Sequence, residues 1–138
     1  MANFVFNRAK GRVTEWAERV NANDPTNSVF VIMALDASGI EADATLLDKD
    51  DFSALVSGTT NEVTNSGYSR KSIDQSGGIT VTYDDTNDRV DVDIPDQTWT
   101  AVAAGSNWSD LVFGYDSDST GGTDSEDDEG EEAENARP

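Results

Sequence analysis

The stretch SVFVIMALD, residues 28–36, decides the fold of this chain. It contains seven consecutive apolar residues, which is the length of a strand. The run is too uniform for an edge strand and too short for a buried helix to be preferred. We therefore expect residues 28–36 to form a central strand.

A hairpin is predicted further along the chain, in GITVTYDDTNDRVDVDIPD, residues 78–96. Apolar and polar residues alternate strictly on both sides of the turn residues DDTND, as they do in strands with one buried face. The inward positions are Ile79, Val81, Tyr83, Val90, Val92 and Ile94. The outward residues Asp91 and Asp93 carry like charges, so the second strand is a poor template for aggregation.

The remaining elements complete a mainly β prediction. Two more strands are expected over 97–103 and 110–115, on either side of a Gly-Ser-Asn turn. A shorter helix of about two turns is expected within residues 48–58. We therefore expect an antiparallel β-sandwich or small barrel with one or two short helices near the N-terminus.

The first helix is expected to begin at Asn7 as its N-cap and to end before Asp24-Pro25. Four apolar residues follow Asn7 at helical spacing: Val13, Trp16, Ala17 and Val20. We expect this face to cover the sheet of its own chain rather than to dock on a partner.

Acidic residues dominate the surface chemistry of the chain, whose 138 residues carry a net charge of -19. Residues 1–115 hold 18 acidic and 8 basic groups, and residues 116–138 hold 10 acidic groups and 1 basic group. Such a surface repels phosphate, which disfavours nucleic acid and anionic membranes as partners. The 3 lysines and 19 aspartates fit either a host with high internal salt or a surface that keeps the protein soluble.

The chain has no histidine and no cysteine. Ser-His-Asp triads, Cys-His pairs and the common zinc sites are therefore excluded, and carboxylates are the only general acids or bases left near neutral pH. An enzyme of this composition would have to use paired carboxylates such as Asp91 and Asp93, as a glycosidase does. A role as surface charge explains these two residues better. We expect a protein that is not an enzyme and has no cofactor. No apolar run reaches the roughly 18 residues of a membrane span.

The composition divides the chain into a β-rich domain, residues 1–122, and an acidic C-terminal tail, residues 123–138. We expect the tail to contact a basic protein surface or to solvate the molecule. Just before the tail, DSDSTGGTDSED matches a calcium loop weakly, with Asp116, Asp118 and Asp124 at ligand positions 1, 3 and 9. Its last position has Asp in place of the usual Glu, and a solvated turn is the preferred interpretation.

The stretch SGTTNEVTNSGYSRKS, residues 57–72, predicts a shaped loop, because small polar residues surround one Val and one Tyr. Asn61, Asn65 and Ser66 can cap backbone groups, and Gly67 permits a positive φ. Arg70 is expected either to pair with a nearby carboxylate of this chain or to help contact a neighbouring subunit. The candidate partner contacts are Asn61, Glu62, Tyr68 and Arg70.

Over residues 7–123 the chain resembles a family of small virion structural proteins encoded by tailed phages and related archaeal viruses. The resemblance rests on an apolar strand after an Asp-Pro segment, a Thr-Asn-Glu and Gly-Tyr-x-Arg loop, and a Trp-containing pair of strands. The matching positions are Asp24-Pro25, Asn61-Glu62, Gly67-Tyr68-x-Arg70, Trp99 and Tyr115. The resemblance implies a structural role in the virus particle.

The resemblance and the composition lead us to expect a virion protein on the capsid surface, a decoration protein that bridges and stabilises major capsid subunits. The expected partners are the major capsid protein or other virion proteins and further copies of this chain, with a trimer preferred. The alternatives are a tail- or neck-associated protein, or a receptor-binding fibre component that stacks glycans on Trp99 or Trp108. An exposed apolar patch on the sheet would favour assembly, whereas an isolated exposed Trp would favour glycan binding.

Overall fold

The structure is a computed structural model, and it describes residues 3–120. Within that range the helical elements are η1 (Asn7–Ala9), α1 (Val13–Ala22), α2 (Asp43–Leu46) and α3 (Phe52–Leu55). The strands are β1 (Val29–Asp36), β2 (Lys71–Ile73), β3 (Thr80–Asp84), β4 (Arg89–Asp93) and β5 (Trp108–Asp116). The predicted central strand, the hairpin and the last strand are therefore present.

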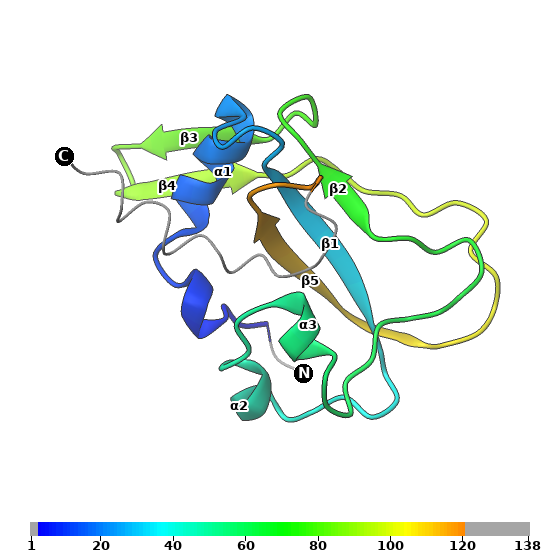
Figure 1. Cartoon of the computed structure of the whole chain (residues 1–138). Coiled ribbons are helices and arrows are strands. Elements are labelled where there is room, and N and C mark those ends of the chain that lie inside the picture. Colours follow the sequence, from blue (N-terminus) through cyan, green and yellow to red (C-terminus); the bar gives the residue numbers. More distant parts are fainter. Residues whose placement is uncertain (1–2, 121–138) are drawn as a thin grey trace.

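Two antiparallel sheets form the body of the described chain (Figure 1). The larger sheet has the order β2-β1-β5, and the smaller sheet is the β3-β4 hairpin. β1 pairs with β5 from Val29↔Asp116 to Ala34↔Leu111, and with β2 through Phe30↔Ile73. The prediction of a mainly β, antiparallel fold is confirmed, and the two sheets do not close into a barrel.

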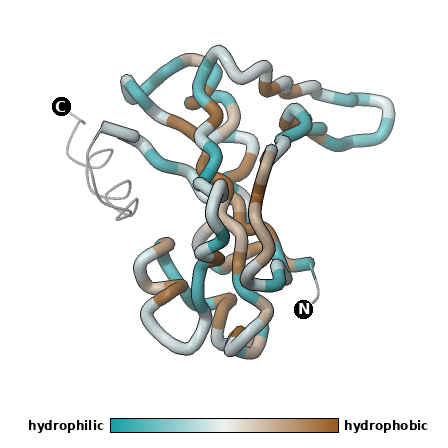
Figure 2. Tube along the Cα trace, turned by 90° about the vertical axis from the view of Figure 1, so that its right-hand side faces the viewer, coloured by the Kyte–Doolittle hydropathy of each residue, from teal (hydrophilic) through white to brown (hydrophobic). Residues whose placement is uncertain are grey.

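β1 is central because both of its faces are buried. Phe30 and Ile32 belong to a first apolar cluster, which α1 and the hairpin cover. Met33 and Leu35 belong to a second cluster on the opposite face, together with residues of α2 and α3. Figure 2 shows the apolar residues along the strands in the middle of the molecule and hydrophilic residues at the turns.

The hairpin is buried less deeply than its alternating pattern predicts. Val81, Val92 and Ile94 are only partly buried, against the first cluster. Tyr83 is 59% exposed and Val90 is 39% exposed, although both occupy predicted inward positions. The inward face extends past the helix that covers it, so its far end meets solvent (Figure 1).

α1 begins later than the sequence suggested. Its N-cap residue is Arg12, and Asn7 starts the separate η1 turn. Gly11, with φ of +78°, divides the two because a left-handed residue cannot continue a right-handed helix. Val13 is exposed, so the buried face of α1 is made by Trp16, Ala17 and Val20.

The strand expected over 97–103 is not formed; this segment is an irregular connection. Ala101 has φ of +58°, which interrupts an extended strand. The segment lies against the 61–70 loop instead: the Ala103 N–H donates to the Ser66 carbonyl at 2.8 Å. Gly67 is required at this contact, because a Cβ there would lie 2.6 Å from the Ala101 carbonyl oxygen.

The region between β1 and the 61–70 loop holds two short helices rather than one. α3 lies within the predicted range 48–58, and the Asp51 side chain caps it by accepting from the Ala54 N–H at 2.6 Å. α2 was not predicted, because its four residues bury only Leu46 and are too few to show a helical period.

Replacing Gly114 by Ala should lower the free energy of unfolding by about 2 kcal/mol. An added Cβ would overlap Cζ of Phe52, so this ring, which belongs to the second apolar cluster, would have to leave its packed position. Urea unfolding of the wild type and Gly114→Ala measures the effect.

The control is a double-mutant cycle with Phe52→Leu. The two substitutions together should cost less than the sum of their separate effects, because the smaller side chain removes the overlap. Simple additivity would show that the strain arises elsewhere.

Candidate interaction site

Glu62 is the centre of a polar network that ties the 61–70 loop to the sheet. Its carboxylate accepts a bidentate pair from Arg70, with Nη2 to Oε2 at 2.7 Å and Nε to Oε1 at 3.0 Å. The Tyr68 hydroxyl donates to Glu62 Oε1 at 2.8 Å and accepts from the Ala34 N–H at 2.9 Å. The loop thereby supplies a hydrogen-bond partner to the backbone of the central strand.

Three aromatic side chains pack beside this network. The ring centroids of Trp99 and Trp108 are 5.4 Å apart, and that of Tyr68 lies 5.3 Å from Trp108. Both indole N–H groups are used within the chain: Trp99 donates to the Ser69 carbonyl at 2.7 Å and Trp108 to Asn65 Oδ1 at 3.2 Å. The cluster holds the two long loops side by side (Figure 1).

The structure therefore confirms the intramolecular brace predicted for Arg70. Of the four candidate contact residues, Glu62, Tyr68 and Arg70 meet in one network, while Asn61 is exposed and donates to the Thr59 carbonyl at 2.9 Å. Contact of these residues with a partner stays a prediction.

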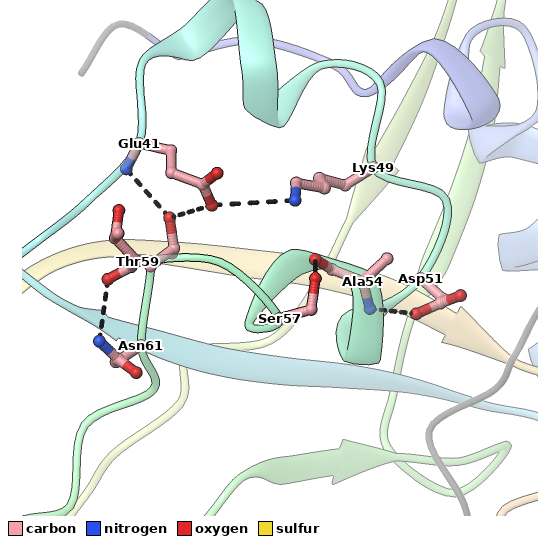
Figure 3. Close-up of polar contacts among 8 residues, drawn as sticks. Glu41, Lys49, Asp51, Ala54, Ser57, Thr59 and Asn61 are labelled. Atoms are coloured by element: carbon pink, nitrogen blue, oxygen red, sulfur yellow. Dashed lines mark hydrogen bonds and ion pairs between the residues drawn. The ribbon is translucent and has the colours of Figure 1, made fainter.

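A second polar cluster joins the loop before α2 to the 57–61 turn (Figure 3). The Thr60 hydroxyl accepts from the Glu41 N–H and donates to Glu41 Oε2, both at 3.0 Å. Lys49 Nζ lies 3.8 Å from the same carboxylate oxygen. Thr60 is fully buried, so these bonds satisfy a hydroxyl that would otherwise be costly to bury.

Leu111 and Phe113 form an exposed apolar strip on β5, which we call the β5 strip. Each is 48% exposed, and as alternate residues of one strand they lie on the same face of the sheet. A hollow of about 200 Å³ adjoins them. Its other walls are Ile32, Ile94, Pro95, Asp96, Gln97 and Trp99.

Sequence reasoning identified β5 but missed this strip. The two residues look like ordinary strand residues, and they are exposed because the elements that cover β1 leave this face of β5 partly open. In the sequence, residues 111–113 are three consecutive apolar residues, so nothing there separates the exposed Leu111 and Phe113 from the buried Val112.

Asp116 and Asp118, from the weak calcium pattern, use their carboxylates in local turns. Asp116 Oδ1 accepts from the Asp118 N–H at 2.9 Å, and Asp118 Oδ1 accepts from the Thr120 N–H at 3.0 Å. Asp124 and the acidic tail, residues 123–138, lie outside the described residues. Over residues 3–120, no three acidic side chains are close enough together to hold a metal ion.

None of the helices between residues 3 and 120 has the length and apolar character that a membrane span requires. Comparisons with known protein families, with curated proteins and with solved structures found no match for this chain.

Replacing Glu62 by Gln should lower the free energy of unfolding by about 2 kcal/mol, because hydrogen bonds to a charged group are worth more than neutral ones. The Glu62 and Arg70 side chains are 24% and 25% exposed, so solvent screens the pair only partly. Urea unfolding measures the loss.

The matched control is Glu15→Gln, which removes the pair with Arg19 on α1. Those side chains are 48% and 36% exposed, so the expected loss is below about 0.5 kcal/mol. Equal losses in the two variants would contradict the bracing role of Glu62.

A second test uses pH. Burial raises the pKa of Tyr68 from 10 to about 12, and the hydrogen bond to Glu62 adds to the shift. Because the folded state holds this proton more tightly than the unfolded chain does, the stabilisation is fully present below pH 10 and is lost as the pH rises toward 12.

The stability difference between the wild type and Tyr68→Phe should therefore shrink from about pH 8 to about pH 11. The phenylalanine variant is the reference, because every titrating group other than Tyr68 is common to both proteins. A difference that stays constant over this range would show that Tyr68 titrates alike in both states.

Proposed function

We propose that this protein is a non-enzymatic structural protein of a virus particle, a decoration protein that binds over neighbouring major capsid subunits. The observation that supports an assembly role is the β5 strip, Leu111 and Phe113, beside its apolar hollow. The resemblance to small virion structural proteins supports the particle as its location.

Single exposed apolar residues are normal on soluble proteins, whereas neighbouring ones beside a hollow are typical of a contact surface. Val5 and Val13, which are also exposed, belong to different segments. Tyr83 and Val90 are exposed and pair across the hairpin, but neither borders one of the hollows. The β5 strip combines two large side chains on one rigid strand, which is the arrangement that an interface core requires.

The arrangement of the tryptophans gives less support to a glycan-binding fibre component. Stacking of a sugar needs an accessible ring face and polar groups around it. Trp99 and Trp108 are half-buried, pack against each other and donate their N–H groups within the chain. Neither is the isolated exposed Trp that this alternative predicts.

The proposed mechanism is a shift of the assembly equilibrium. A protein that binds only the assembled shell stabilises that state by mass action. Because the chain carries a net charge of -19, its attachment sites should be rich in Lys and Arg. Repeated sites around a symmetric shell favour clusters of this chain, and a trimer is the preferred arrangement.

The test is the protein content of purified particles of the virus that encodes this chain. Mass spectrometry should detect the chain in many copies per particle, and a reconstruction should place it on the outer capsid surface. Density for the chain on the tail or neck would contradict the capsid location and support the alternative. Absence of the chain from purified particles would contradict the proposal as a whole.

The β5 strip can be tested in the same particles. The double substitution Leu111→Ser with Phe113→Ser should reduce occupancy about tenfold or more, because each buried apolar side chain contributes on the order of 1.5–3 kcal/mol. Val13→Ser is the control, since it removes a residue that is 41% exposed on α1. Unchanged occupancy in the double variant would contradict the role of the strip.

A further inference from the structure

We propose that the open edge of β5 binds an extended, basic and apolar segment of a partner protein, which joins the three-stranded sheet as a fourth strand. This inference deepens the proposed function by naming the mode of docking. Strand addition of this kind uses main-chain hydrogen bonds for affinity and alternate side chains for specificity.

The direction of the β1 backbone groups can be read from Ala34. Its N–H donates to the Tyr68 hydroxyl and its carbonyl accepts from the Val63 N–H at 3.1 Å, both on the side of β1 where β2 lies. Successive residues of an antiparallel strand direct their backbone groups to opposite sides. The N–H and carbonyl of Met33 therefore point toward β5.

The pairing register shows which residues of β5 direct their backbone groups toward β1. Met33 lies opposite Val112, so Val112 and Gly114 use their backbone groups to pair with β1. The N–H and carbonyl groups of Leu111 and Phe113 consequently point away from β1. Within residues 3–120, no other strand pairs with β5 on that side, and Figure 1 shows β5 at the margin of the sheet.

This edge also has room for the side chains of an added strand. A hollow of about 70 Å³ lies along residues 112–115 of β5 and is walled by Phe6, Trp16, Phe52 and Leu55. Phe113 also borders the larger hollow beside the β5 strip. A strand placed at the edge would thus meet apolar side chains around the open backbone groups.

Polar groups around the hollows define the charge of the occupant. Asp50 and Asp51 line the first hollow and Asp96 lines the second. The one cation among the lining residues, Lys49, is near Glu41. A segment that alternates apolar residues with Lys or Arg matches both the hollows and the carboxylates.

A second copy of this chain fits the same edge less well. Its β5 would bring Asp110 and the charge of another acidic molecule next to the carboxylates that line the two hollows. Like charges placed together across a strand pair are destabilising. The partner is therefore a segment of another protein.

The test uses the purified full chain and a synthetic nine-residue peptide of alternating valine and lysine with blocked ends, as long as β5. Amide hydrogen exchange, followed by NMR, should slow about tenfold or more at Leu111 and Phe113 on binding. Val112 and Gly114 should be protected with and without the peptide. Binding without new protection at Leu111 and Phe113 would overturn the inference.

Peptide controls separate strand addition from charge attraction. The same peptide N-methylated at alternate backbone nitrogens keeps its charge but loses one hydrogen-bonding edge, and it should bind at least about fivefold more weakly. Equal binding of the two peptides would show that charge alone acts. Protection of Leu111 and Phe113 that rises with protein concentration and without peptide would identify a second copy as the occupant and overturn the stated partner.

A protein variant gives the matching control on the other side. Phe113→Pro and Phe113→Ala both remove the ring, but only proline also removes the outward N–H, which an edge strand tolerates. Proline should weaken peptide binding about fivefold relative to alanine, provided that both melt cooperatively. If proline prevents folding, the N-methylated peptide decides. If the peptide does not bind as a strand but the chain is found in particles, only the strand-addition mode is wrong. If the peptide binds as a strand but the chain is absent from particles, only the virion role is wrong.

Discussion

The structure depends on the burial of β1 on both of its faces. A strand in that position needs two covering layers, and a chain of this size has little apolar material to supply them. α1 and the hairpin cover one face, and α2 with α3 covers the other. These elements cover β1 and do not extend fully over β5, so β5 keeps an open edge and an exposed strip. The candidate interface is therefore a consequence of how the core is built.

The two long loops are also held in place with little apolar material. Residues 61–70 and 97–107 contain few aliphatic residues, yet they are fixed by the carboxylate of Glu62, the amide of Asn65 and a small aromatic cluster. Asn65 donates to the carbonyls of Ala103 and Ser106, at 3.0 Å and 3.2 Å. These bonds replace a sheet ladder as the link between two segments far apart in the sequence. The loop is a structural part of the domain.

Sequence reasoning succeeded where local pattern and tertiary environment agree. The apolar run of β1 and the alternation of β3 and β4 each imply a burial state, and the structure confirms the elements. It missed the break at Gly11, where a left-handed residue separates η1 from α1. It also failed where a distant contact decides, because Ala101 adopts a positive φ beside Gly67. The β5 strip was out of reach for the same reason, since exposure of Leu111 and Phe113 depends on where other elements end.

The pairing of β1 with β5 has a consequence for the order of folding. Val29 pairs with Asp116, so most of the described chain lies between the two partners. Pairs so distant in sequence form slowly, because the entropy of closing the intervening chain must be lost before the contacts stabilise it. During synthesis, the central strand must wait until β5 has left the ribosome. Until then β2, the helices and the hairpin can cover its faces, but the edge of β1 that pairs with β5 stays open.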